Sequence, residues 1–425
     1  TTAAAATSAA DTASATTAAA STAAKQEDFS GVKLTVVTRG GLSDEDVWKD
    51  AKAAWEQRTG GKVEFQVIGD FANFDVKYAG YIASKDSSVD LLYSYVGFTG
   101  AYGANLYEDI SSVIGDTSDF LPGVLKAATV DGKLLLVPVH SEMEFFQFNT
   151  ALFTAAGIDP ASPPKTWQEY FDLTSKLKTG DVAANVTPMV HAGTSFPYFM
   201  LFYNSTDSDL LSADLKSVNF KNDNGLKAFE TMAAGMKSGF FDPKAITLPT
   251  EYDTGKIFNA GKAASQCSFA ELWGQAVNPE MSKITDSVGF SVMPGIEAGQ
   301  TGSFNGFEGF ALNKFGKQKE AALSFALEMV DPAVQKAMTL SKVLPSSRAS
   351  ILQDPDVLKE YPIGSVLAEQ GSHRVDRPSP PYYNDMSTVF DSVMARLWKG
   401  NITAQQAVDE AASGVQKAID NFYNG

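Results

Sequence analysis

The residues of this sequence that could do chemistry are carboxylates, aromatic rings and a few arginines near the ends of predicted strands. Carboxylates and amides bind hydroxyl groups, and flat rings stack on the weakly polar CH faces of sugars. The candidates in the first half of the chain are Arg39, Gly41, Ser43, Tyr95, Phe98, Phe196 and Tyr198. Those in the second half are Glu271, Trp273, Asn305, Phe307, Glu308 and Arg374.

Several of these residues have a competing structural interpretation. Tyr95 and Phe98 lie in a Gly-rich stretch, which favours a ligand-facing loop over core packing. Phe196 and Tyr198 belong to a dense aromatic run, where core packing is the stronger interpretation. For Arg374 a surface ion pair is the stronger one.

Glu271 and Trp273 alternate, so an extended strand end would point both side chains to one face, for hydrogen bonding and stacking. Asn305, Phe307 and Glu308 flank Gly306 and Gly309, and glycines of this kind open a backbone edge to a cleft. We expect at least one of these three side chains to contact a ligand.

Groups for catalysis or metal binding are scarce. The single cysteine, Cys267, excludes an internal disulfide, and its apolar surroundings predict a buried, inert thiol. Three scattered histidines give no metal-ligand spacing, so no cofactor or metal is expected. Glu142 and Glu144 could form a glycosidase pair, but they share a strand face and no pattern of eight βα units surrounds them.

The elements that must position these residues alternate along the chain. A strand from Val32 is followed by a helix over 44–58 and a second strand over 62–69. Further helices and strands continue the alternation, which predicts a mostly parallel sheet covered on both faces. Ligands of such sheets bind at the carboxyl ends of strands, which here lead into residues 38–46 and 94–105.

Composition sets the outer bounds. The 425 residues are enough for two domains, and 44% of them are hydrophobic, enough for a core in each. A net charge of −16 argues against nucleic acid and anionic membrane surfaces as partners. No run approaches the roughly 20 apolar residues of a membrane-spanning helix. Residues 1–29 begin with an Ala/Thr-rich tract that predicts a disordered tether.

Four stretches resemble the family 1 extracellular solute-binding proteins of ABC importers, the group that includes the maltodextrin-binding proteins. Residues 131–170 are similar to the family's crossover strand, with its "NxxLFxxAGI" and "PxTWxE" runs, and residues 255–274 to its "FxxGKAAM" strand. Residues 304–338 resemble its Gly-rich strand and the "KxKEAA" helix. The last stretch, 343–350 with 377–411, resembles its "PxR" break and terminal helix.

The resemblance implies a two-lobed α/β fold of the periplasmic-binding-protein type II, with a ligand cleft between the lobes. It places Glu142 where the family's acidic crossover residue meets the ligand, although a hydrogen bond to the hinge is an equal alternative. The family's "GPW" is replaced here by Phe269, Ala270 and Glu271, so the aromatic ring is displaced to Trp273.

The implied lobes comprise 30–139 with 295–347 and 140–294 with 348–425. The chain crosses between them near Pro138, where a strand should break or bend because proline cannot donate to a ladder. The implied function is capture of a carbohydrate, expected to be an oligosaccharide, by hinge closure and its delivery to an ABC permease. A polyol or glycerol phosphate is the alternative ligand, and an adhesin or a glycoside-active enzyme is a remote one. We expect a monomer outside the cytoplasm, either periplasmic or anchored as a lipoprotein.

Overall fold

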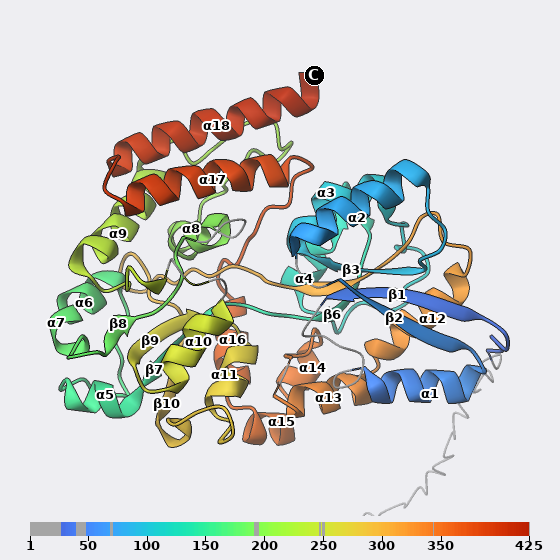
Figure 1. Cartoon of the computed structure of the whole chain (residues 1–425), viewed down its shortest axis with the longest axis horizontal. Coiled ribbons are helices and arrows are strands. Elements are labelled where there is room, and N and C mark those ends of the chain that lie inside the picture. The colour runs from blue at the N-terminus through green and yellow to red at the C-terminus, as the bar shows by residue number, and fades with distance from the viewer. Residues whose placement is uncertain are drawn as a thin grey trace, which may run out of the picture.

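The computed structural model describes residues 27–39, 48–68, 71–190, 195–245, 248, 251–342 and 344–424. These residues form two lobes, each built on one main sheet with helices packed around it (Figure 1). The predicted two-lobed α/β fold is therefore confirmed.

The sheet of the first lobe has the strand order β2-β1-β3-β11-β6. Its strands are β1 (Lys33–Arg39), β2 (Lys62–Ile68), β3 (Leu91–Tyr95), β6 (Val137–His140) and β11 (Glu308–Leu312). β1, β2 and β3 are parallel, and β11 runs against both β3 and β6. Because only β11 is reversed, its first residue lies at the sheet edge where the other strands end.

Helices cover this sheet and bury its apolar strands. They are α1 (Lys49–Thr59), α2 (Phe71–Ser84), α3 (Val96–Leu106), α4 (Pro122–Ala127), α12 (Lys319–Met329) and α13 (Pro332–Leu340), beside the short hairpin of β4 (Thr129–Val130) and β5 (Lys133–Leu134). Trp55 joins α1 to α12, with its ring 5.6 Å from that of Phe325 and its indole N–H donating to Ser324 Oγ at 2.9 Å. Phe29 stacks on Trp55 at 5.8 Å, so packing begins inside the segment predicted as a tether, most of which lies outside the described residues.

The sheet of the second lobe has the strand order β10-β7-β9-β8. Its strands are β7 (Phe145–Asn149), β8 (Ala183–Asn185), β9 (Ala263–Ser268) and β10 (Val288–Ser291). Here β7 is the reversed strand, and its first residue, Phe145, pairs with Ser268 at the end of β9. Both sheets thus have one reversed strand beginning where a neighbouring strand ends.

The helices of the second lobe pack mainly around an aromatic core. They are α5 (Thr150–Ala155), α6 (Trp167–Asp172), α7 (Thr174–Leu177), α8 (Ser195–Tyr203), α9 (Asp223–Ser238), α10 (Glu251–Asn259), α11 (Ala270–Ala276), α14 (Ala349–Leu352), α15 (Pro355–Glu360), α16 (Gly364–Gly371), α17 (Tyr383–Trp398) and α18 (Ala404–Asn424), with the 3₁₀ turns η1 (Asn204–Thr206) and η3 (Thr285–Ser287). The long amphipathic helix α18 lies along α17 at the top of the lobe, as Figure 1 shows, and buries Val408 and Val415.

The chain passes from the first sheet to the second between His140 and Phe145 and returns between Ser291 and Glu308. The strand does not break at Pro138, because β6 contains this proline and continues to His140, but its pairing is irregular there. β6 is the edge strand of its sheet, where a missing N–H removes no ladder bond, and the pairing with β11 shifts its register beside Pro138.

The Gly-rich stretch after β3 was predicted as a loop and is the helix α3. Its glycines permit close packing rather than a turn. A Cβ at Gly100 would lie 1.6 Å from the carbonyl oxygen of Ser379, and one at Gly103 would lie 2.5 Å from the Leu135 side chain. Tertiary packing here outweighs the low helix propensity of glycine.

Candidate functional site

The strand ends of the first lobe bring four polar side chains to one edge. Arg39 ends β1, Tyr93 lies near the end of β3, and His140 ends β6. Glu308 begins the reversed strand β11 and pairs in register with Tyr95 and His140. The predicted site residues Arg39 and Glu308 therefore meet at the edge that faces the second lobe.

Glu308 is the centre of a buried hydrogen-bonded cluster. Its carboxylate accepts hydrogen bonds from Arg39 Nε at 3.1 Å and Tyr93 Oη at 2.6 Å, and lies 2.8 Å from His140 Nε2. Burial disfavours the charged carboxylate, but the positive charge of Arg39 and the hydrogen bonds outweigh it and lower the pKa of Glu308 to about 2. This carboxylate is charged and fully engaged, so it holds Arg39 and the strand ends in place.

Glu142 lies in the crossover and is buried between the lobes. Its backbone carbonyl accepts a hydrogen bond from Gly306 N at 2.7 Å, which ties the outgoing crossover to the returning one. Its Oε1 atom is buried without a hydrogen-bond partner. Burial, and then the charges of Glu271 and Glu308, raise the pKa of Glu142 well above its usual range. The backbone of Glu142 thus joins the two crossovers, while its carboxyl keeps an acceptor atom without a partner.

Glu271 comes to the same place from the second lobe. It lies in the first turn of α11, and its Oε2 accepts a hydrogen bond from Tyr252 Oη at 2.8 Å. Burial raises the pKa of the Glu271 carboxyl, although the charge of Arg39 acts in the opposite direction. The strand end predicted for Glu271 and Trp273 is wrong, because β9 stops at Ser268 and both residues are helical.

Trp273 accordingly points away from Glu271, since residues two apart on a helix do not share a face. It is buried with its ring 5.4 Å from Tyr361 and 6.4 Å from Phe290, in a core cluster of the second lobe. The aromatic residue at the end of β9 is instead Phe269, which is only partly buried. Its ring lies 5.6 Å from that of Phe304, against Gly306.

Arg377 is the cation of the second lobe that meets aromatic rings of both lobes. Its guanidinium lies 5.1 Å from the ring centre of Tyr95 in the first lobe and 5.7 Å from those of Phe304 and Tyr383. Its Nε and one terminal nitrogen donate to Tyr383 Oη at 3.0 and 2.7 Å. This arginine was not among the predicted site residues, although it begins the stretch 377–411 that resembles the family.

The neighbouring arginine that was predicted, Arg374, forms ion pairs with Asp207, Asp209 and Asp376 on the outside of the second lobe. The alternative interpretation, a surface ion pair, is therefore the one that the structure supports.

The other predicted side chains divide between core and cleft margin. Phe98 is buried on α3 beside Phe74 and Tyr102, and Phe196 is buried on α8 against Phe390. Both serve the cores, because helices place these rings inward.

Tyr198 is also buried on α8, but its ring lies 5.8 Å from that of Phe304 at the cleft margin. Asn305 uses its side chain within the crossover, accepting from Phe307 N at 2.7 Å, and Phe307 is buried in the core of the first lobe. Gly41 and Ser43 lie outside the described residues.

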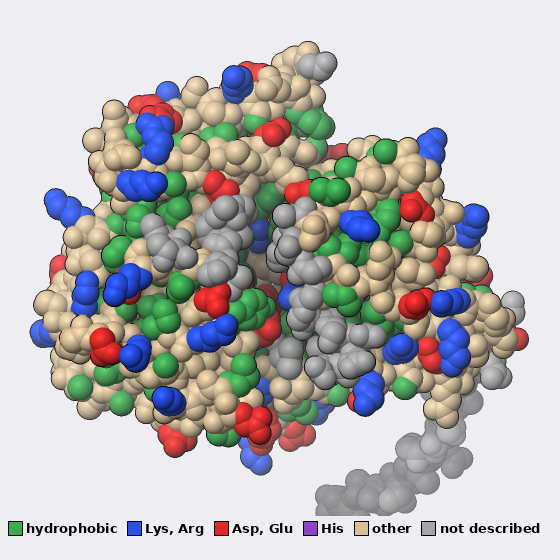
Figure 2. All heavy atoms as spheres, in the orientation of Figure 1, with side chains coloured by type: hydrophobic (Ala, Val, Ile, Leu, Met, Phe, Trp, Pro, Cys, Tyr) green, Lys and Arg blue, Asp and Glu red, His purple; other side chains and the backbone are tan. Residues whose placement is uncertain are grey.

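The two lobes touch across the cleft. Ser379 Oγ accepts a hydrogen bond from Gly100 N at 2.8 Å, and Lys126 Nζ lies 2.8 Å from Asp376 Oδ1. Asn384 Nδ2 donates to Asp75 Oδ1 at 3.3 Å. Figure 2 shows that the molecule is hollowed between the lobes on this face. The contacts describe a closed arrangement in which ends of both sheets face one another.

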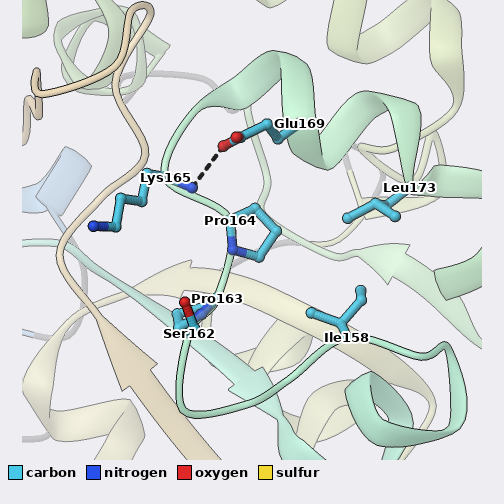
Figure 3. A pocket seen from close by; sticks show the side chains of 7 residues that line it. All are labelled: Ile158, Ser162, Pro163, Pro164, Lys165, Glu169 and Leu173. Carbon is cyan, nitrogen blue, oxygen red and sulfur yellow. Dashed lines mark hydrogen bonds between the residues drawn. The ribbon is translucent and has the colours of Figure 1, made fainter.

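A separate open pocket on the second lobe belongs to a helix start. It is lined by Ile158, Pro164 and Leu173 together with the turn before α6, as Figure 3 shows. Lys165 N and Thr166 N both donate to Glu169 Oε2 in a capping box, so the polar groups there are already used for the fold. Within the described residues, no group of three or more His, Cys, Asp or Glu side chains could hold a metal ion, and no helix could span a membrane.

A family model described as bacterial extracellular solute-binding protein matches residues 50–363, and the chain belongs to this family. A probable ABC transporter-binding protein of Deinococcus radiodurans is 23% identical over 82% of this chain and 84% of its own length.

Solved structures of sugar- and polyol-bound proteins share the fold. The maltose-bound MalE3 of T. maritima has a TM-score of 0.81 and 21% identity, covering 91% of this chain and 99% of that one. An ABC transporter solute-binding protein of Agrobacterium radiobacter in complex with ribitol has a TM-score of 0.78 and 21% identity, covering 92% and 100%.

Proposed function

We propose that this protein is the substrate-binding component of an ABC importer that captures a carbohydrate between its lobes and delivers it to the membrane permease. The observation that carries this proposal is the meeting of buried carboxyls and aromatic rings where the strand ends of both lobes face each other. Glu142 and Glu271 supply acceptors for hydroxyl groups, and Tyr95 and Phe269 supply flat apolar surfaces. The maltose and ribitol bound by proteins of this fold support a polyhydroxylated ligand.

The charges at the cleft favour such a ligand over a phosphate ester. Carboxyls outnumber arginines there, and Arg39 already forms an ion pair with Glu308. Arg377 is the second arginine of the cleft, and its contacts are with tyrosine and phenylalanine rings. A dianionic phosphate beside Glu142 and Glu271 would be repelled by these carboxyls when they are ionised, so it could enter only if both stayed protonated.

Hinge closure is the proposed mechanism, with the lobes divided as predicted and the crossovers as the hinge. Ligand bound between the lobes would stabilise the closed state by its larger affinity for that state, and the permease would recognise the closed form. We also propose that the protein acts as a monomer outside the cytoplasm and that residues 1–29 serve as its tether, as in a lipoprotein.

A thermal-shift screen against oligosaccharides, monosaccharides and polyols tests the proposed function. At a ligand concentration of about 100 times Kd, binding should stabilise the fold by about 2.7 kcal/mol and raise Tm accordingly. A matching compaction in small-angle scattering is expected for a closing clamp, whereas an adhesin would show none. Release of fluorophore from fluorogenic glycosides would instead indicate an enzyme, and the absence of any shift across the panel would contradict the proposal.

A further inference from the structure

Glu144 is a fully buried carboxyl whose two oxygen atoms both lack a hydrogen-bond partner. It lies directly before β7, and its backbone carbonyl accepts a hydrogen bond from Ser303 Oγ at 2.6 Å. Leaving a carboxyl buried and unpaired is costly, so buried polar groups are nearly always satisfied. The proposed function so far gives this side chain no role.

Glu144 lies beside the cleft. Helix α10 begins with Glu251, whose charge acts on Glu144, and the next residue, Tyr252, donates to Glu271 in the cleft. The backbone of Glu144 is hydrogen-bonded to Ser303, which precedes Phe304, and the next residue, Phe145, pairs with Ser268, which precedes Phe269. Glu144 is therefore held against the two segments that carry Phe269 and Phe304 at the cleft.

The site has more carboxyls than positive charges to balance them. Within the described residues, none of Glu142, Glu144, Glu251 and Glu271 forms an ion pair with a Lys, Arg or His side chain. The stretches between Arg39 and Glu251 that the structure does not describe contain no Lys or Arg in the sequence, and their one histidine is His191. The chain itself supplies no Lys or Arg for Glu144 there, and a bound ligand could supply the missing positive charge.

We propose that the ligand carries a protonated amine beside its hydroxyl groups, as an amino sugar does, and that Glu144 binds this amine. The proposal rests on the proposed function, because it assigns the ligand class of the same cleft. An unpaired carboxylate needs hydrogen-bond donors and a positive charge. An ammonium group supplies both, with three donors. A neutral sugar offers donors alone.

The state of the carboxyl in the free protein supports this assignment and gives it a direct signature. Burial, and then the charge of Glu251, raise the pKa of Glu144 well above its usual range, so the free carboxyl tends to hold a proton. Binding of a preformed ammonium would convert it to a carboxylate and release that proton to the solvent. A neutral sugar would release none at this site.

Calorimetry on the full chain can compare β-1,4-linked oligosaccharides of glucosamine with those of glucose and N-acetylglucosamine at equal length. At about pH 5.5, where the amines of the glucosamine units are protonated, we expect the glucosamine series to bind at least about tenfold more tightly. Titrations in two buffers of different ionisation heat should show proton release with that series alone.

Glu144→Gln should abolish both the preference for the amine and the proton release while it retains the neutral oligosaccharides. Glu230→Gln, an exposed position on α9, is the control for a change in net charge. Because Glu144 makes no side-chain hydrogen bond, its replacement should not lower Tm in the absence of ligand. If that variant fails to fold, Glu251→Gln is measured instead: removing the charge that raises the pKa of Glu144 should reduce the number of protons released when the glucosamine series binds.

Equal binding of charged and neutral oligosaccharides would overturn this inference and leave the proposed function standing. A preference for the amine that survives Glu144→Gln would overturn the role given to Glu144. If no member of any series binds, both the inference and the proposed function fail.

Discussion

Three glutamates near the crossover show how the surroundings decide what one residue type does. Glu308 receives hydrogen bonds from Arg39 and Tyr93 and is held as a carboxylate. Glu142 and Glu144 are equally buried, yet neither forms an ion pair with a side chain described by the structure, and burial raises the pKa of both. The carboxylate of Glu308 therefore stabilises the fold, whereas Glu142 and Glu144 each have an oxygen atom without a partner that could bind a ligand.

Replacing Glu308 tests its structural part. Glu308→Gln keeps the shape of the side chain but removes the charge that pairs with Arg39, and breaking a buried ion pair typically costs about 3 to 5 kcal/mol. Urea unfolding should show a loss of this order. Glu297→Gln removes one partner of the exposed pair with Lys227 and should change stability little. Equal effects of the two variants would contradict the role assigned to Glu308.

Strand-end reasoning from the sequence placed only part of this group of side chains. Arg39 and Glu308 meet at strand ends, whereas Glu142 lies in the crossover and Glu271 in the first turn of α11. Arg377 was missed in favour of Arg374, three positions earlier. Which of the two arginines faces the cleft depends on the path of the segment between α16 and α17, and periodicity contains no information on a segment without regular structure.

At the scale of elements, apolar periodicity predicted strands such as β1 and β2, whereas close packing decided the exceptions. The glycines of α3 predicted a loop, but its backbone must approach Ser379 of the second lobe. The alternation of Glu271 and Trp273 predicted a strand, but these residues follow β9 and start α11. A two-residue alternation is too short to distinguish a strand from the first turn of a helix.

Helix α3 makes the closed arrangement sensitive to one glycine. A Cβ at Gly100 would lie 1.6 Å from the carbonyl oxygen of Ser379, so Gly100→Ala should separate the lobes without disturbing either core. We expect ligand affinity to fall by about tenfold or more, together with loss of the ligand-dependent compaction in small-angle scattering.

Gly80→Ala is the matched control for Gly100→Ala. Gly80 is an exposed helical glycine of α2 with nothing near its Cβ position, so alanine there should raise stability by about 0.5 to 1 kcal/mol and leave affinity unchanged. A Gly100→Ala protein that binds and compacts like the wild type would show that the contact with Ser379 is not needed for closure.

At the scale of the whole molecule, the two sheets share one arrangement of strands beside the crossovers. Each contains one reversed strand, β11 or β7, whose first residue lies beside the end of a neighbouring strand. The crossovers enter or leave at these two points, so the proposed hinge and the polar strand ends occupy one region. Movement at such a hinge would change the burial of the same carboxyls that would bind ligand and would couple closure to charge.

This coupling predicts an unusual dependence of stability on pH. Burial raises the pKa values of Glu142, Glu144 and Glu271 above the 4.5 of a free glutamate, so the folded state binds more protons than the unfolded state above that pH. The free energy of unfolding must then fall as the pH rises from about 4.5 through the raised pKa values. Below about 4.5 the lowered pKa of Glu308 acts in the opposite direction, because its stabilisation is lost as it becomes protonated.

The ligand-free protein should therefore be more stable at about pH 5 than at about pH 8. For each carboxyl that is protonated only in the folded state, the free energy of unfolding should fall by about 1.4 kcal/mol per pH unit. Urea unfolding across this range measures the slope, and Glu144→Gln should make it shallower because one proton fewer is bound. The glucosamine series, if it binds as proposed, should also reduce the slope by stabilising the carboxylate. Stability that rises toward pH 8, or a slope unchanged in Glu144→Gln, would mean that Glu144 is not a buried unpaired carboxyl in solution.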